Sequence, residues 1–173
     1  MTSAQDLGRI LLKPTPILLY SDITRNPEGF ISDLLMHQRA IVLVRTSERQ
    51  GHWVALTLNL PQRKAYFFSS FGTRPDEDKM RYVKPQVSKQ LGQSMNLMSR
   101  ILRDYFKTDH NLEIHYNQYR YQDPEDYTDE SCGLWCVLFI NMGLDEDKFN
   151  DFVKQLCRKR GVSYKEFIHT FFK

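Results

Sequence analysis

Residues 122–136 read QDPEDYTDESCGLWC, and the apolar run that follows Cys132 continues to Met142. A polar, turn-prone segment followed directly by an apolar run predicts a loop that ends at the first turn of a buried helix. Cys132 lies at this junction, where unpaired backbone N–H groups and the positive end of the helix dipole favour a thiolate. A free cysteine is more often a small core residue, but a core cysteine belongs inside the apolar run. We therefore predict that Cys132 is a nucleophile, with Gly133 leaving room for a substrate backbone.

A thiol nucleophile needs a proton acceptor, and His52 is the best-placed histidine for that role. It precedes a β-favouring run at residues 53–58 that predicts a strand, so its side chain would sit on a rigid element. Trp53 follows the base, where it either shapes a substrate-binding cleft or belongs only to the core. We expect structural roles for the other four histidines, which are His37, His110, His115 and His169.

Four short motifs occur in one order along the chain: His52-Trp53, residues 67–72 (FFSSFG) with Pro75-Asp76, Tyr116-Asn117 with Gln122, and Ser131-Cys132-Gly133. In this order they resemble the maturation cysteine proteases of adenoviruses, large DNA viruses and virophages, which belong to the clan of the ubiquitin-like-protein proteases. The resemblance runs from about Ser21 to Val137. It implies an α+β fold in which a small, mainly antiparallel sheet packs against helices and the nucleophile stands at a helix N-terminus.

The resemblance also implies how the site works. His52 takes the proton of Cys132, the thiolate attacks a peptide carbonyl, and the Cys132 N–H and the Gln122 side-chain amide hold the oxyanion. Two alternatives remain open, namely that Gln118 is the donor and that Gln122 is a solvated loop residue. The implied function is cleavage of viral capsid or core precursors beside glycine during virion maturation, in the virion and in the cytoplasm or nucleus of the infected cell. No cofactor and no membrane are expected, and a nucleic-acid or peptide activator is left open.

Two other functions fit the same residues. An isopeptidase that deconjugates ubiquitin-like proteins would use the same site. A catalytically weak binding homologue is suggested by Ser69, because related viral enzymes carry an acid there to orient the histidine. A serine hydroxyl accepts the imidazole N–H but supplies no charge, and we expect an active enzyme in which Ser69→Ala costs modestly. Asp76 or Asp78 would supply the charge only through an excursion of the following loop.

Two further features have plain alternatives. Cys132 and Cys136 are one helical turn apart and with a histidine would make a zinc site. The apolar neighbours of Cys136 favour a core position instead, and we expect no metal. The basic run at residues 158–160 would suit nucleic acid, yet cations are favoured at a helix C-terminus in any case.

Composition sets broad limits. The 173 residues suit one domain, 1–173, and the 41% hydrophobic content excludes a disordered chain. No apolar run reaches the ~18 residues of a membrane span, and residues 1–6 lack the features of a secretory signal, so secretion is not expected. Three cysteines, an odd number, indicate free thiols in a reducing compartment. A net charge of +3 does not by itself indicate nucleic acid.

Periodicity predicts the elements before the nucleophile. Residues 1–25 are expected to be irregular because two prolines block a helix, and Asn26-Pro27-Glu28 has the form of a helix start. Residues 40–45, 52–58 and 65–69 predict an antiparallel meander. A charged loop at residues 73–84, a helical apolar stripe from Val87 to Phe106 and an alternating strand at residues 112–116 are expected next.

Three helices are expected from Cys132 onward. The first ends at Gly143, a residue suited to the left-handed C-cap. The second carries Phe149 and Leu156, and the third opens at a capping box that begins at Ser163. Together these elements predict an α+β fold in which a small sheet carrying His52 packs against the helix of Cys132.

Overall fold

The computed structural model describes residues 1–173, whose centre is one five-stranded sheet in the order β1-β2-β3-β4-β5. The three central strands pair antiparallel, whereas β1 joins β2 and β5 joins β4 in parallel. The α+β fold is therefore confirmed, with a mixed sheet that is antiparallel only at its centre. The strands are β1 (Ile17–Leu19), β2 (Arg39–Arg45), β3 (Gly51–Asn59), β4 (Lys64–Phe68) and β5 (Glu113–Tyr116).

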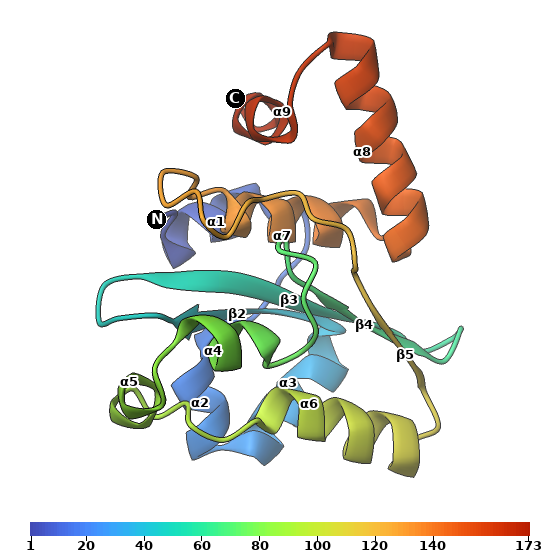
Figure 1. The fold of residues 1–173 in the computed structure, drawn as a ribbon. Coiled ribbons are helices and arrows are strands. Elements are labelled where there is room, and N and C mark those ends of the chain that lie inside the picture. The colour runs from blue at the N-terminus through green and yellow to red at the C-terminus, as the bar shows by residue number, and fades with distance from the viewer.

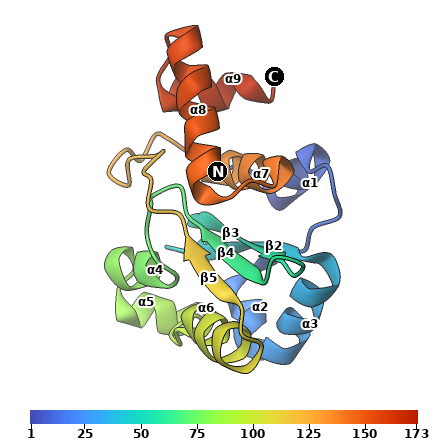
Figure 2. The same ribbon diagram turned by 90° about the vertical axis from the view of Figure 1, so that its right-hand side faces the viewer.

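Helices cover both faces of the sheet (Figure 1). On one face lie α1 (Ala4–Ile10) and α7 (Cys132–Met142), with α8 (Glu146–Arg160) and α9 (Tyr164–Phe171) beyond α7. The turned view in Figure 2 shows the remaining helices on the opposite side of the strands. These are α2 (Tyr20–Arg25), α3 (Pro27–His37), α4 (Glu77–Tyr82), α5 (Pro85–Gln90), α6 (Leu97–Arg100) and a π-helix at Ile101–Asp109. None of them combines the length and the apolar character that crossing a bilayer requires.

Each face of the sheet has its own apolar core, because side chains alternate along the strands. In β3, Trp53 and Ala55 pack on the side of α7, whereas Val54 and Leu56 pack with the helices of the other side. α7 is apolar around its whole circumference, which is typical of a helix buried between a sheet and further helices. Trp135 and Cys136 of this helix are completely buried. The first residue of α7 is thus fixed by a fully packed helix.

Most of the expected elements are confirmed. The three central strands lie within one residue of the expected bounds. α3 begins after Asn26, whose side chain accepts the N–H of Gly29, and α9 begins with a complete capping box at Ser163. α7 ends at Gly143, which has the left-handed φ of 63°.

Three expectations are wrong. Residues 1–25 are ordered, since Ser3 caps α1 and the segment after the prolines forms β1 and α2. The expected helix from Val87 to Phe106 is interrupted at residues 91–96, where Gly92 takes a φ of 69°. Only the second half of its apolar stripe, Met98, Leu102 and Phe106, packs into the core, whereas Met95 is exposed. The expected charged loop at residues 73–84 contains α4, whose acidic first turn suits a helix N-terminus.

Candidate active site

Cys132 is the first residue of α7, as the change from polar to apolar sequence predicted. The backbone N–H of Trp53 in β3 lies 3.5 Å from its sulfur, and the Cys136 thiol donates to the Trp53 carbonyl at 3.3 Å. These two contacts pin the start of α7 to the start of β3, where His52 precedes Trp53. No hydrogen bond joins the imidazole to the Cys132 thiol in this resting arrangement, and such contacts often tighten only when substrate binds.

In this arrangement burial opposes the expected thiolate–imidazolium pair. Burial raises the pKa of the Cys132 thiol to about 11, although the N–H groups of Trp53 and Gly133 favour its charged form. Burial likewise lowers the pKa of His52 to about 3. Desolvation disfavours both charged forms and outweighs the helix N-terminus here. Burial therefore favours transfer of the Cys132 proton during the attack rather than before it.

Contacts on two sides hold the imidazole of His52 in place. Phe71 stacks on its face with ring centroids 3.8 Å apart, and Nε2 lies 2.9 Å from Oγ of Ser69. The Ser69 hydroxyl in turn lies 3.0 Å from Oδ2 of Asp78, a buried residue of α4. The turn after Ser69 depends on Gly72, whose φ is 73° and whose Cβ would lie 2.9 Å from the Gln118 carbonyl oxygen.

The structure thus brings Ser69 to the predicted base and adds Asp78, which the sequence named only as one of two remote options. The other option, Asp76, accepts hydrogen bonds from Tyr20 and Ser99 and does not reach His52. The helix-forming pattern around Asp78 could have indicated this position, because a helix, and not a loop, brings the Asp78 carboxylate toward the strand.

Gln122 is buried and held at both ends of its amide, whereas the alternative Gln118 is exposed. Its oxygen accepts from the Ser70 hydroxyl at 2.8 Å, and its nitrogen donates to the carbonyl of Asp129, three residues before the nucleophile. Gln122 is therefore part of the loop that leads to Cys132 rather than a solvated glutamine. One N–H of its amide has no protein partner, and the oxyanion role remains a prediction.

Trp53 and Gly133, expected to shape the substrate cleft, lie beneath the N-terminal segment. A Cβ at Gly133 would lie 2.9 Å from Cδ2 of Leu7 and 3.0 Å from Cδ1 of Trp53, and Leu7 itself is fully buried. The indole N–H of Trp53 donates to the Thr2 carbonyl at 3.1 Å. This cover was not predicted, because residues 1–25 were expected to be irregular.

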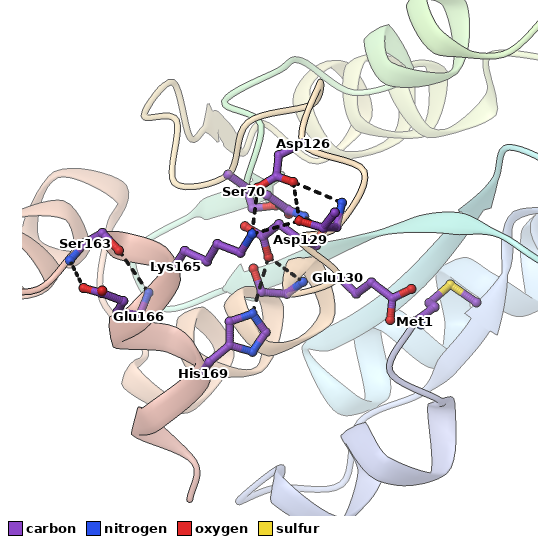
Figure 3. A network of polar contacts seen from close by, with 12 residues as sticks. Met1, Ser70, Asp126, Asp129, Glu130, Ser163, Lys165, Glu166 and His169 are labelled. Atoms are coloured by element: carbon purple, nitrogen blue, oxygen red, sulfur yellow. Dashed lines mark hydrogen bonds and ion pairs between the residues drawn. The ribbon is translucent and has the colours of Figure 1, made fainter.

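Polar contacts with α9 hold the loop before the nucleophile (Figure 3). Lys165 donates to Asp126 at 2.8 Å and to the Thr128 hydroxyl at 3.0 Å. His169 lies 3.6 Å from the carboxylate of Asp129, which also accepts the N–H of Ser131. The lysine, followed by Thr128, lowers the pKa of Asp126 to about 2. The C-terminal helix therefore helps to shape the approach to Cys132.

The two remaining alternatives have structural explanations. Nowhere do three or more His, Cys, Asp or Glu side chains gather as a metal site would require, and the Cys136 thiol is engaged with Trp53. The basic run of residues 158–160 forms the last turn of α8, which ends at the left-handed Gly161. Cations at that position interact favourably with the helix dipole.

Residues 24–168 match the Ulp1 protease family, C-terminal catalytic domain, whereas no curated protein matches the chain. Among solved structures, the chain is similar to the C-terminal Ulp1 protease domain in complex with Smt3, the yeast ortholog of SUMO. The identity is 11% and the TM-score 0.36, over 79% of this chain and 62% of that chain. It is also similar to ChlaDub1 from Chlamydia trachomatis, with 15% identity and a TM-score of 0.35, over 81% of this chain and 61% of that chain. The chain thus spans less than two thirds of either structure. The clan expected from the motifs is confirmed, and the chain belongs to the Ulp1 protease family as a cysteine protease domain.

Proposed function

We propose that the chain is an active thiol protease that cleaves after the C-terminal glycine of a ubiquitin-like protein. The family match supports this substrate class. The observation that carries the chemistry is the 3.5 Å contact between the Trp53 N–H and the Cys132 sulfur, because it sets the nucleophile beside the strand end that holds the histidine.

In the proposed reaction, Nδ1 of His52 accepts the proton of Cys132 as the sulfur attacks the scissile carbonyl. The negative charge moves to the carbonyl oxygen, where the N–H of Cys132 and the free N–H of Gln122 donate to it. The imidazolium then protonates the leaving amine, and the C–N bond breaks to leave a thioester on Cys132. Water, deprotonated by His52, releases the acid and restores the thiol.

Transfer of the proton during attack fits the burial of Cys132 and His52. A thiol whose pKa is about 11 is a weak nucleophile at neutral pH, and a neighbouring base has to activate it. Substrate binding would also have to move Leu7 and Thr2, which now cover Trp53 and Gly133.

Maturation of viral capsid or core precursors is the alternative, and it uses the same residues and the same chemistry. It differs in the substrate, which would be an extended glycine-containing segment instead of a folded ubiquitin-like protein, and in its place in the virion and the infected cell. A nucleic-acid or peptide activator belongs to this alternative.

The test compares a linear ubiquitin-like fusion with a Gly-Gly peptide and with capsid-precursor segments, using the wild type and Cys132→Ala. We expect the fusion to be cleaved at least ~10²-fold faster than the peptide, because the folded partner contributes binding energy that the peptide lacks. Cleavage of the precursor segments alone would favour maturation. Activity retained in Cys132→Ala would refute the nucleophile, and a wild type inactive on every substrate would point to a binding homologue.

A further inference from the structure

We infer that Asp78 of α4 is the acid that orients His52 and balances its charge, acting through the hydroxyl of Ser69 and directly across the site. Asp78 and Ser69 are then positioning residues for the reaction proposed above, on which this inference rests. The carboxylate therefore comes from α4 and not from the end of β4, where Ser69 stands.

The hydrogen bonds around Ser69 determine which nitrogen of His52 carries the proton. Oγ of Ser69 lies within 3.0 Å of Nε2 of His52, the Thr73 hydroxyl and Oδ2 of Asp78. An ionised carboxylate only accepts hydrogen bonds, so the single hydroxyl proton of Ser69 goes to Asp78. Nε2 must therefore carry the imidazole proton and donate it to Ser69. This tautomer leaves the lone pair of His52 on Nδ1, the atom that the reaction needs as a base.

The imidazole of His52 and the carboxylate of Asp78 are also close to each other. Nε2 of His52 lies 3.4 Å from Oδ2 of Asp78, and both side chains are almost completely buried. This distance is too long for a strong hydrogen bond but short for a charge pair. When His52 becomes an imidazolium during turnover, the carboxylate stabilises it with little screening by solvent.

The fold leaves the carboxylate of Asp78 incompletely satisfied. Its Oδ1 is buried without a hydrogen-bond partner, and burial raises the pKa of Asp78 to about 6. The other charged groups that face it are Glu77 and Arg81 of its own helix, and Arg81 pairs with Glu77 instead. A structural carboxylate is normally paired with a cation, and the basic group within 4.0 Å of this carboxylate is His52.

The test uses Asp78→Asn, Ser69→Ala, the double variant Ser69→Asp/Asp78→Asn, and Glu77→Gln as the matched control on the same helix. On the substrate that the wild type cleaves, we expect Asp78→Asn to lower kcat/KM by ~10²- to 10⁴-fold. The double variant, which returns the acid to the strand, should recover at least ~10-fold of that loss, and Glu77→Gln should stay within about twofold of the wild type.

The second readout needs no substrate. In ¹⁵N-histidine NMR of the Cys132→Ala protein, we expect the Nε2–H tautomer of His52, and a mixture of tautomers once Asp78→Asn is added. If Asp78→Asn keeps kcat/KM and tautomer while Cys132→Ala is inactive, the inference is wrong and the proposed function stands. Activity in Cys132→Ala would instead overturn the proposed function. Should Asp78→Asn fail to fold, an unchanged tautomer in Ser69→Ala would refute the inference.

Discussion

Leu7 of α1 and Gly133 of α7 interlock over Trp53, and this contact predicts that substitutions at the two positions are strongly coupled. Leu7 is fully buried, so Leu7→Ala should lower the free energy of unfolding by about 2–5 kcal/mol. Gly133→Ala places a Cβ 2.9 Å from the Leu7 methyl and 3.0 Å from the Trp53 ring, and this overpacking should cost about 1–3 kcal/mol.

In the double variant the new methyl occupies part of the space that Leu7 vacates, while alanine is favoured over glycine in a helix by up to ~1 kcal/mol. Gly133→Ala should therefore cost much less in the Leu7→Ala background, where only the 3.0 Å contact with the Trp53 ring remains, with a coupling of at least ~1 kcal/mol. Urea unfolding of the four proteins at one pH measures the cycle. Effects that add within ~0.5 kcal/mol would show that α1 does not lie on the wall of the site.

Three other predictions follow from charge and burial. The folded-state pKa of Asp78, about 6, lies above the 3.8 of the unfolded chain, so ionising this carboxyl costs stability as pH rises from about 4 to 6. Asp78→Asn should thus stabilise the fold by up to about 3 kcal/mol at pH 7.5 and by almost nothing at pH 4 in urea titrations; equal effects at both pH values would contradict this. Because the Cys132 pKa is about 11, labelling of Cys132 by iodoacetamide should rise ~10-fold per pH unit between pH 7 and 10, whereas a plateau near neutral pH would reveal a preformed ion pair. Lys165→Met removes the cation that holds Asp126, so chymotrypsin should cut faster after the exposed Tyr127, with Lys159→Met as the control; equal rates would show that α9 does not order this loop.

Hydrophobic periodicity predicted the central strands and the start of α7, because their structure depends mainly on which residues are buried. The runs around Val42 and Val54 are apolar enough to be strands in any context, and the junction at Cys132 marks a helix start by composition. Caps at Asn26 and Ser163 act within a few residues of themselves, so they too can be recognised locally.

The expectations that the structure corrects concern features that depend on residues far away in the sequence. β1 exists because Ile17 to Leu19 pair in parallel with Ile41 to Leu43, more than twenty residues away, and a three-residue strand leaves almost no local pattern. The degree to which burial opposes the charged forms of Cys132 and His52 depends on how completely other segments cover them, which the dipole argument could not include. Ser69 was correctly expected next to His52, but the source of the charge lay in a helix that had been expected to be a loop.

The elements missed in the sequence are also those that hold Asp78 in place. An acid that is delivered by a helix can serve a strand-borne histidine only if that helix is fixed to the sheet. Asp76, the left-handed residue before α4, provides the attachment: its carboxylate accepts the Tyr20 hydroxyl of α2 at 2.6 Å and the N–H and hydroxyl of Ser99 in α6 at 2.8 and 2.6 Å. Lys79 lies 3.9 Å from that carboxylate and donates to the Met95 carbonyl at 2.6 Å.

This attachment satisfies Asp76 with a cation and three donors, whereas Asp78, two residues later, has only the hydroxyls of Ser69 and Thr73 as donors and an unpartnered Oδ1. The two neighbouring aspartates therefore differ in the way that separates a structural carboxylate from one kept available for chemistry. The same contrast explains how a serine can stand at the end of β4: once α4 is locked through Asp76, Oδ2 of Asp78 is already within 3.0 Å of Ser69, and a carboxylate on the strand itself would bring two buried like charges together.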